Sequence, residues 1–287
     1  GYVFNDKLQR TVATGSVIER KDANMDESTL ENLVLFLFRG SAPGLAEYER
    51  DLLRQVAVLP PTTHAPALLA RLFGVAENEQ TEFFNDLDGL DRRGVLLKKD
   101  GEYQLHHLVR AVALRELTPS PENCAAVLQN VTNLLRIDQA RDNPVDKFPF
   151  VGYGEALLEV FAESDEQEVG LLQHELALVY EDLGNYERAR DLLEAALASV
   201  LRNFSPDHPN VTACQSNLAT VYSELGNHER ALDLLEAAFA SDLKHFGIDH
   251  PTVAVRQSNL ATVYIEYGIY ERARDLLEAA LASVLRN

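Results

Sequence analysis

Two Asp-His pairs are the residues of this chain whose types and spacing could support chemistry. Asp207-His208-Pro209 returns as Asp249-His250-Pro251, and an aspartate beside a histidine can act as a ligand set or as a catalytic pair. A proline after these residues suits the first turn of a helix, where a preceding Asp or His side chain caps the free backbone N–H groups. Because the motif recurs in each loop, we favour the capping role.

The rest of the sequence offers no catalytic arrangement. It holds no phosphate-binding loop of the form G-x-x-x-x-G-K-S/T, and no nucleophile stands beside a base. Cys124 and Cys214 lie far apart, without metal or redox spacing, so we expect both to be buried thiols in a reduced, cytoplasmic protein. We therefore predict that this chain is not an enzyme and holds no metal or cofactor of its own.

The formal net charge of the chain is −19, from 26 basic and 45 acidic residues. An acidic surface repels phosphates, so this composition argues against nucleic-acid and anionic-membrane partners. The longest apolar run, residues 33–38, is far shorter than the ~20 residues that a membrane span needs. No signal peptide is visible and the chain opens on Gly-Tyr-Val-Phe without a methionine, so we expect a piece of a longer protein.

The C-terminal half is an internal repeat. The segment YERARDLLEAALASVLRN occurs at residues 186–203 and again at residues 270–287, letter for letter. Glycines, tyrosines and alanines share a 42-residue register: Gly184, Gly226 and Gly268; Tyr180, Tyr222 and Tyr264; Ala189, Ala231 and Ala273. Self-similarity at a period of roughly 20 to 50 residues is typical of stacked repeat architectures.

The local pattern within each unit is helical. Apolar residues recur at helical spacing in two stripes, Ala189, Leu192, Leu193, Ala196, Leu197 and Val200, and then Leu218, Val221, Tyr222 and Leu225 before the stop Gly226-Asn227. Nothing alternates with a period of two, which excludes blades of strands. Each unit is therefore predicted to be helix, tight turn, helix and loop, with Phe204 and Phe246 anchoring the loops on the helices beneath.

The arrangement N-L-A-x-V-Y-x-x-x-G-x-x-E-R-A-x-x-L-L-E-A-A resembles the tetratricopeptide repeat. The long period and the D-H-P-x-V motif make it most similar to the variant in kinesin light chains and nephrocystin-type proteins, over about residues 168–287. This resemblance implies a mainly α fold in which α-α hairpins stack as a right-handed solenoid, with Ala219, Ala231 and Ala238 letting the helices approach closely. Since each unit buries its apolar face only against its neighbours, we expect further units beyond Asn287.

In tetratricopeptide arrays the first helix of each pair lines a concave groove that holds a protein or peptide. The matching positions are His174, Glu181, Asp182, Ser216, Thr220, Ser223, Glu224, Ser258, Thr262, Ile265 and Glu266, with Leu171, Leu178, Ala213 and Val255 beside them. The predicted wall is small and hydroxyl-bearing, edged by an acidic row, without Lys or Arg. We therefore expect a basic or polar segment as the ligand rather than a terminal carboxylate. A solvated acidic face without a ligand is the alternative.

The N-terminal half has a different pattern. Apolar spacing and stop residues predict helices over residues 45–59, 65–73 and 83–94, and Asp100-Gly101 between two strand-like runs predicts a hairpin over residues 95–105. Three helices and a short β-hairpin make a winged helix. The helix that would enter the DNA groove is rich in Glu and Asp, so DNA binding is disfavoured.

Three stretches are similar to the winged-helix domain of STAND ATPases, the NB-ARC and NACHT-type switch proteins: L-L-R-Q-V-A-V-L-P, L-x-x-L-D-R-R-G-V-L and Y-Q-L-H-H-L-V-R. They cover roughly residues 30–117. In that family the winged helix follows the nucleotide-binding domain and precedes a repeat sensor, often of tetratricopeptide units, which is the order found here. The resemblance implies that ADP or ATP binds an upstream domain of an intact parent protein.

The Met-His-Asp motif of that family matches Leu105-His106-His107. By this match His106 contacts the β-phosphate of ADP in the intact parent and holds its closed state, a contact that an imidazole can make as a donor. His107 departs from the family's aspartate, so the motif's supporting contact is not carried over. The alternative is a histidine at a strand–helix junction, satisfied by neighbouring backbone.

We predict four segments along the chain. They are residues 1–28, the tail of an upstream domain or a linker; residues 29–117, the winged-helix domain; residues 118–166, a degenerate helical adapter; and residues 167–287, the tetratricopeptide repeats. The break Thr118-Pro119-Ser120-Pro121 separates the second segment from the third.

The leading hypothesis is the sensor part of a STAND signalling ATPase. In it the repeats recognise a protein or peptide trigger, and the winged helix helps hold the ADP-bound inactive state. The resemblance further implies oligomerisation of the parent and a role in signal transduction or antiphage defence. An interaction scaffold of the kinesin-light-chain type is the first alternative, and a winged-helix regulator on DNA is the second.

Overall fold

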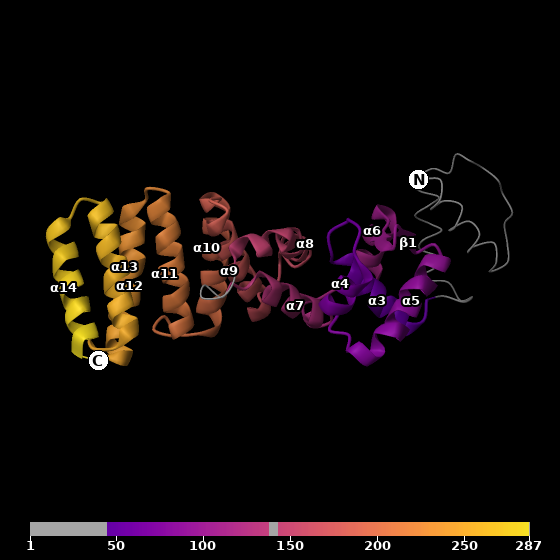
Figure 1. The fold of residues 1–287 in the computed structure, drawn as a ribbon, viewed down its shortest axis with the longest axis horizontal. Helices are drawn as coiled ribbons and strands as arrows, with labels where there is room; N and C mark the ends of the chain where they lie inside the picture. The colour runs from indigo at the N-terminus through magenta and orange to yellow at the C-terminus, as the bar shows by residue number, and fades with distance from the viewer. Residues whose placement is uncertain (1–44, 138–142, 287) are drawn as a thin grey trace. The chain divides into compact units, whose positions relative to one another are not determined.

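The computed structural model describes residues 45–137 and 143–286 (Figure 1). The predicted tail at residues 1–28 and the apolar run at residues 33–38 lie outside this range. The chain divides into two compact units. The first contains the residues up to Val131 together with Glu155–Ala162, and the second contains Thr132–Gly154 together with the residues from Glu163 onward. Both units therefore draw on the segment that the sequence sets apart as an adapter.

The first unit consists of short helices and one β-hairpin. Its elements are α3 (Glu47–Ala57), α4 (Pro66–Leu72), the 3₁₀ helix η1 (Glu77–Glu79), α5 (Gln80–Arg92), β1 (Leu96–Lys99), β2 (Glu102–Leu105) and α6 (His107–Glu116). The three helices and the hairpin predicted from the sequence are all present. The strands are antiparallel, and Asp100 and Gly101 both have positive φ, 53° and 86°, as a two-residue turn of type I′ requires.

Apolar side chains of these elements meet in one core. Leu53 of α3, Leu69 of α4 and Leu87 of α5 are fully buried, which follows from the helical spacing of leucines in each segment. Polar contacts fix the hairpin on α5. The Tyr103 hydroxyl of β2 donates to Asp88 (2.5 Å), and Lys98 of β1 donates through its ammonium to Asp88 (2.7 Å) and through its backbone N–H to Asp91 (2.9 Å). The hairpin is therefore part of the packed unit rather than an exposed arm.

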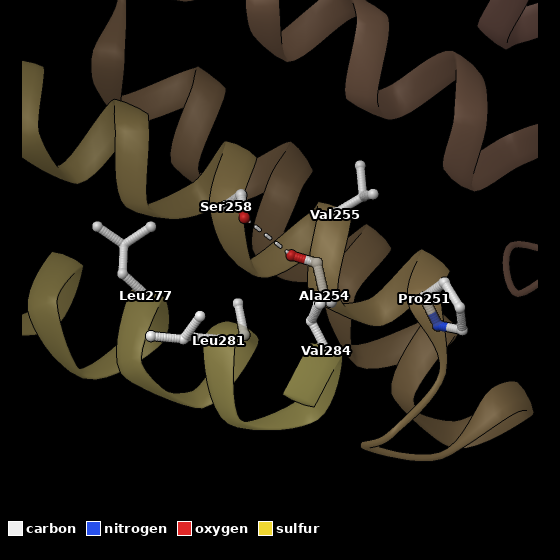
Figure 2. A pocket seen from close by; sticks show the side chains of 8 residues that line it. Pro251, Ala254, Val255, Ser258, Leu277, Leu281 and Val284 are labelled. Atoms are coloured by element: carbon white, nitrogen blue, oxygen red, sulfur yellow. Dashed lines mark hydrogen bonds between the residues drawn. The ribbon is translucent and has the colours of Figure 1, made fainter. Parts of the chain in front are cut away.

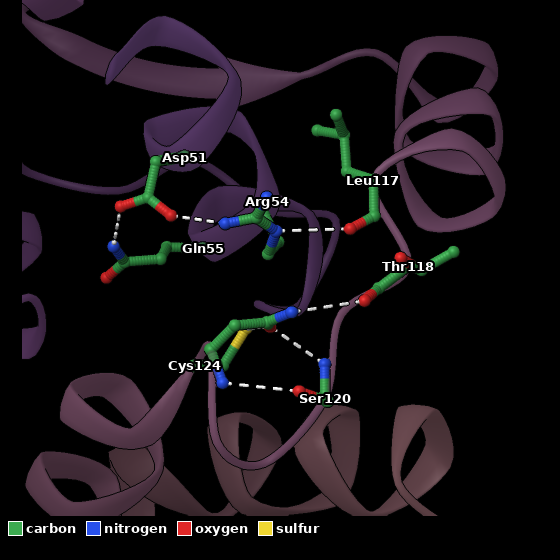
Figure 3. A network of polar contacts seen from close by, with 8 residues as sticks. Asp51, Arg54, Gln55, Leu117, Thr118, Ser120 and Cys124 are labelled. Carbon is green, nitrogen blue, oxygen red and sulfur yellow. Dashed lines mark hydrogen bonds and ion pairs between the residues drawn. The ribbon is translucent and has the colours of Figure 1, made fainter. Parts of the chain in front are cut away.

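A polar network joins α3 to the segment that follows α6 (Figure 3). The Arg54 guanidinium donates to Asp51 in its own helix and to the backbone carbonyl of Leu117 (3.1 Å). The backbone N–H of Cys124 donates to the Ser120 carbonyl (3.0 Å), which closes the turn at the predicted Pro-rich break. Arg54 thus fixes the end of α6 against α3, and the chain turns directly afterwards.

Three further elements lead from this turn to the repeats: α7 (Ala125–Leu135), the 3₁₀ helix η2 (Pro144–Phe150) and α8 (Val151–Val160). Cys124 and Cys214 are both buried, as predicted. Burial raises the pKa of each thiol to about 12, so neither is a nucleophile near neutral pH. None of the helices in the described parts of the chain is long and apolar enough to cross a membrane.

The second unit contains three consecutive helical hairpins (Figure 1). They are α9 (Gln167–Asp182) with α10 (Tyr186–Asn203), α11 (Pro209–Glu224) with α12 (His228–Phe246), and α13 (Pro251–Glu266) with α14 (Tyr270–Arg286). These are the helix pairs that the 42-residue period predicts. Each tight turn needs a glycine, because Gly184, Gly226 and Gly268 have φ of 73°, 73° and 83°, a region that side chains disfavour.

Small residues and tyrosines set the packing of one hairpin on the next. Ala219, Ala231 and Ala238 are fully buried, so the helices approach closely, as predicted. The Tyr222 hydroxyl donates to Glu194 of the preceding hairpin, and 42 residues later Tyr264 donates to Glu236 (2.5 Å). The same contact between a first helix and the previous second helix therefore recurs along the array.

The loops between hairpins show what the Asp-His-Pro motif does. The Nδ1 atoms of His208 and His250 accept the backbone N–H groups two residues later, both at 3.2 Å. The histidines therefore cap α11 and α13, as predicted, whereas Asp207 pairs with Lys244 (2.5 Å). The Phe204 ring stacks on that of His208, the N-cap residue of α11, with centroids 4.2 Å apart.

One junction between hairpins contains a buried ion pair. The Arg256 guanidinium of α13 donates to Asp242 of α12 (2.9 Å), and the two side chains are only 9% and 2% exposed. At the preceding junction the equivalent positions, 42 residues earlier, hold Cys214 and Val200. A buried ion pair of this kind contributes little net stability, but removal of one partner leaves an uncompensated buried charge.

We predict that Asp242→Val destabilises the array by about 3 to 5 kcal/mol, because the Arg256 guanidinium then stays buried without its carboxylate. The double variant Asp242→Val with Arg256→Cys recreates the chemistry of the preceding junction and is expected to recover stability to within about 1 kcal/mol of the original. Urea unfolding followed by circular dichroism measures both. Equal destabilisation of the single and double variants would contradict this account.

Candidate functional site

The first helices of the three hairpins form one continuous surface. Helix α9 contacts α11, and α11 contacts α13, in addition to the contacts within each hairpin. Asparagines cross between these helices: Asn217 Nδ2 lies 2.9 Å from His174 Nε2, and Asn259 Nδ2 donates to Ser216 Oγ (3.3 Å). The predicted site residues therefore lie on neighbouring helices of one rigid wall.

The structure distributes the predicted site residues by depth. Asp182, Thr220, Glu224, Thr262, Ile265 and Glu266 are exposed, His174, Glu181, Ser223 and Ser258 are half-buried, and Ser216 is buried. Ser216 thus differs from the expectation, because its hydroxyl is covered and accepts Asn259 instead of facing a ligand. Leu171 and Val255 beside the site are 43% and 59% exposed.

The hydroxyl groups of the wall are already engaged as donors. Thr220, Ser258 and Thr262 each donate to the carbonyl four residues earlier in their own helix, at 3.2, 3.0 and 3.1 Å. Their oxygens can still accept a hydrogen bond. The wall therefore offers small side chains and acceptor oxygens, which suits a ligand that donates.

The carboxylates of the wall differ in their surroundings. Glu266 accepts the Ser223 hydroxyl, and His228 Nδ1 lies 3.9 Å from it. One repeat earlier, Glu224 is equivalent to Glu266, and Glu181 occupies the position equivalent to Ser223. Glu224 therefore has a carboxylate at the position where Glu266 has a serine hydroxyl. Two carboxylates therefore face each other where the next junction pairs a carboxylate with a hydroxyl.

This replacement changes the proton affinity of Glu181. Burial, followed by the charges of Asp182 and Glu224, raises the pKa of the Glu181 carboxyl to about 7. The charge of Glu224 is also the main reason that the pKa of Tyr186 is raised. Among the described residues no Lys or Arg forms an ion pair with Glu181, so this part of the wall carries negative charge without compensation near neutral pH.

The half-buried His174 is the other titratable group of the wall. Burial lowers the pKa of its imidazole, with Arg136 lowering it and Glu175 raising it to smaller extents. The neutral ring accepts the Asn217 amide, so His174 contributes to the asparagine contacts and adds no charge. No group of His, Cys, Asp and Glu in the described parts of the chain is arranged to hold a metal ion.

His106 lies in the other compact unit, at the N-cap of α6. Its Nδ1 accepts the backbone N–H of Leu108 (3.3 Å), and its ring lies 4.2 Å from that of His107. Burial, with the neighbouring charge of His107, lowers the pKa of His106 to about 4. The ring is therefore neutral at pH 7, capped on the backbone as the alternative interpretation expects, and its proton is placed on Nε2.

The asparagines between the helices and the residues at the end of the wall were not predicted from the sequence. Asn217 and Asn259 are 42 residues apart, so the repeat register carried a signal for a contact between units. His228 and Tyr186 occupy equivalent positions after the tight turn, and their types differ between units. Only the structure shows that both lie beside the acidic row.

Comparison with known proteins identifies the repeat. Residues 168–244, which span α9 to most of α12, match the family model described as tetratricopeptide repeat. These hairpins are tetratricopeptide repeats. The third hairpin continues the same 42-residue register. No curated protein gives a significant match to the chain.

Several solved structures are similar to the chain. A putative kinesin light chain of Podosopora anserina with nearly identical tetratricopeptide-like repeats is 22% identical, covering 78% of this chain and 98% of that one, with a TM-score of 0.47. BtubC (BKLC) from P. vanneervenii is 21% identical over 77% and 81% of the two chains, with a TM-score of 0.49.

A third similar structure is a STAND protein with a tetratricopeptide repeat sensor from Pyrococcus horikoshii. It is 16% identical, the alignment covers 97% of this chain and 55% of that one, and the TM-score is 0.28. None of these three likenesses bears on what this chain binds.

The raised pKa of Glu181 predicts a dependence of stability on pH. The folded chain holds a proton on Glu181 up to about pH 7, whereas the ordinary pKa of a free glutamate is 4.5. Between these values the folded state binds more protons than the unfolded state, so this group makes stability fall as the pH rises from 4.5 to 7.

Glu181→Gln is therefore expected to raise the unfolding temperature at pH 8 by about 2 °C after allowance for solvent screening, and to leave it unchanged at pH 4. Thermal unfolding at both pH values measures this. Asp233→Asn, on the exposed side of α12, is the control and should change neither value. An equal effect of Glu181→Gln at both pH values would contradict the prediction.

Proposed function

We propose that the tetratricopeptide array is a recognition module for a basic segment of a protein or peptide, held along α9, α11 and α13. The single observation that supports this proposal is the group of carboxylates at the first junction, where Glu181, Asp182 and Glu224 lie together without an ion-pair partner among the described residues. Burial raises the pKa of Glu181 most, and repulsion from Asp182 and Glu224 raises it further; a cation of the ligand placed there relieves this repulsion.

The surrounding wall supports an extended ligand. The hydroxyl oxygens of Thr220, Ser258 and Thr262 accept hydrogen bonds, and their small side chains leave room for a backbone to approach. Amide and ammonium donors of a basic peptide match these acceptors, while a terminal carboxylate would meet like charge. Association should therefore be steered by charge and weaken at high salt.

In a wider role we propose that the chain is the sensor part of a STAND signalling ATPase. This proposal rests on the sequence resemblance over residues 30–117 and on the order of a helix–hairpin unit followed by repeats. The helices α3, α4 and α5 and the hairpin β1–β2 have the element order of a winged helix. Trigger binding to the array would favour an open form of the parent, provided that the trigger binds this form more tightly.

His106 fits one contact to a nucleotide in such a parent. With Nδ1 accepting Leu108, Nε2 carries the ring proton and can donate to a phosphate oxygen. A bound nucleotide would supply the switching energy, and this chain would supply the one imidazole contact. The sequence holds no phosphate-binding loop of its own, so this chain by itself is proposed to be no enzyme.

An interaction scaffold of the kinesin-light-chain type is the second candidate. It uses the same acidic wall and requires no nucleotide switch. The backbone cap made by His106 favours it, because this cap accounts for the residue without any ligand.

Glu224→Lys is expected to weaken binding of a basic peptide by roughly tenfold, because it places a cation where the ligand's cation should lie. The probe is a fluorescent 12-residue peptide of alternating Ser and Lys, compared with its Ser-Glu counterpart. Asp233→Lys changes the chain's net charge equally at a position away from the wall and should alter affinity by less than about twofold. Equal effects of the two substitutions would remove the acidic wall as the binding surface.

In the STAND parent, His106→Ala is expected to speed ADP release by roughly tenfold, because one charge-assisted hydrogen bond to phosphate is lost. His107→Ala, its neighbour in sequence, is the control and should leave release nearly unchanged. Stopped-flow release of a fluorescent ADP analogue measures both rates. Identical rates for His106→Ala and the unsubstituted parent would favour the scaffold.

A further inference from the structure

The first compact unit contains a pocket between α6 and α8. It has a volume of about 300 Å³, and its lining residues all belong to this unit: Arg110, Leu114, Thr118, Pro119, Glu159 and Val160. Half of these residues are apolar, and the others bring a guanidinium, a hydroxyl and a carboxylate. This size and mixed lining suit a small molecule that has an apolar part and one polar group.

The larger pocket between α13 and α14 has a different chemistry (Figure 2). Its volume is about 480 Å³, and its lining contains no charged side chain. The hydroxyl of Ser258 in this lining donates to the Ala254 carbonyl (3.0 Å). Of these two pockets, the one beside α6 therefore offers a charged group to a ligand.

Arg110 has an incomplete set of hydrogen bonds. Its side chain is only 15% exposed, and its Nε and Nη2 atoms are both buried without a hydrogen-bond partner among the described residues. The N–H groups of these two atoms lie along one edge of the planar guanidinium, the edge that binds a carboxylate or phosphate through two parallel hydrogen bonds. Because a buried charged donor without an acceptor is unfavourable, this edge lacks an oxyanion.

Glu159 is close to this edge but does not complete it. Its Oε2 atom lies 3.9 Å from Arg110 Nη2, and its side chain is 76% exposed. That distance is too long for a hydrogen bond, and an exposed ion pair of this kind contributes little stability. Glu159 can therefore turn toward solvent at small cost, which leaves both N–H groups open to an oxyanion that enters through the pocket.

The lining at Thr118 is held in a strained conformation (Figure 3). Thr118 has a φ of 41°, in the left-handed region that β-branched residues rarely adopt. The preceding carbonyl, of Leu117, accepts a hydrogen bond from Arg54 Nε (3.1 Å). The Thr118 carbonyl itself accepts one from Asn123 Nδ2 (3.2 Å). Strain of this kind is concentrated at ligand-binding and active sites, and here it fixes one wall of the pocket in advance.

We propose that this pocket binds a small organic anion, whose carboxylate or phosphate group replaces Glu159 at the Nε–Nη2 edge of Arg110. The apolar part of the ligand then lies against Leu114 and Val160. The net charge of −19 does not prevent this binding, because salt screens exposed charges beyond about 10 Å whereas Arg110 acts at contact distance. The site lies in the first compact unit and the acidic wall in the second, so each proposal can fail without the other.

Benzoate and phenyl phosphate are suitable probes, because they share an apolar ring and differ in the anionic group; benzamide is the neutral control. In the ¹⁵N-labelled full chain, the Nε–Hε signal that Arg110→Lys removes belongs to Arg110. One or both anions should move this signal in a saturable way, and benzamide should not. Movement with benzoate alone assigns a carboxylate ligand, and movement with phenyl phosphate alone assigns a phosphate. If neither anion moves the signal at up to about 20 mM, the proposal is overturned.

Matched arginine variants test the role of the planar edge. Arg110→Lys keeps the charge but loses the paired N–H groups, so it should weaken anion binding by at least about tenfold. Arg115→Lys is the control, since Arg115 lies in the same helix with a side chain that is 53% exposed and paired with Glu116; it should change the affinity by less than about twofold. Saturation-transfer NMR measures binding, and circular dichroism checks folding. Equal effects overturn the proposal.

Glu159→Gln tests whether Glu159 gives way to a ligand. This variant should bind the anions about fivefold more tightly, because it removes a competing charge about 4 Å from the bound group. Glu187→Gln removes the same charge at an exposed position of the repeats and should leave the affinity unchanged. If Glu159 is instead the permanent partner of Arg110, Glu159→Gln lowers the unfolding temperature without tightening anion binding, and this result overturns the proposal.

Discussion

The array depends on one packing constraint: the apolar stripe of each second helix is buried only when the next hairpin's first helix lies on it. Leu193 and Leu277 have the same neighbours in sequence and very different exposure, which shows that the stripe itself does not decide its burial. Stability in such a structure is a sum of hairpin terms and nearest-neighbour terms. The tyrosine–glutamate contacts repeat because at each junction the first helix of one hairpin packs on the second helix of the preceding hairpin.

The same constraint creates the acidic wall. Close packing of consecutive hairpins draws α9, α11 and α13 together, so side chains about 42 residues apart become neighbours. At one junction the Ser223 hydroxyl lies beside the Glu266 carboxylate, and at the other the Glu181 carboxyl lies near that of Glu224. A single difference between two nearly equal units therefore concentrates charge at the first junction. The whole wall is acidic, but the negative charge without an ion-pair partner is concentrated at the first junction.

Periodicity made the helix pairs, their turns and their alanine contacts predictable, since each depends on residues near in sequence or one period away. The hairpin at Asp100-Gly101 was predictable for the same reason, because its turn chemistry is local. Burial of Ser216 and stacking of Phe204 on His208 were not, since they depend on how far neighbouring helices approach. Charge compensation could not be predicted either. The sequence shows four acidic residues on the wall, and only the structure shows that Glu266 contacts Ser223 and His228 whereas Glu181 lies near other carboxylates.

The ion pair between Asp242 and Arg256 has a consequence for how nearly identical hairpins find their order. If α13 docked on α10 in place of α11, the Arg256 guanidinium would face Val200, and the Asp242 carboxylate would lose its partner. That arrangement strands the guanidinium in an apolar setting. The ion pair thereby favours docking of the third hairpin on the second over docking on the first.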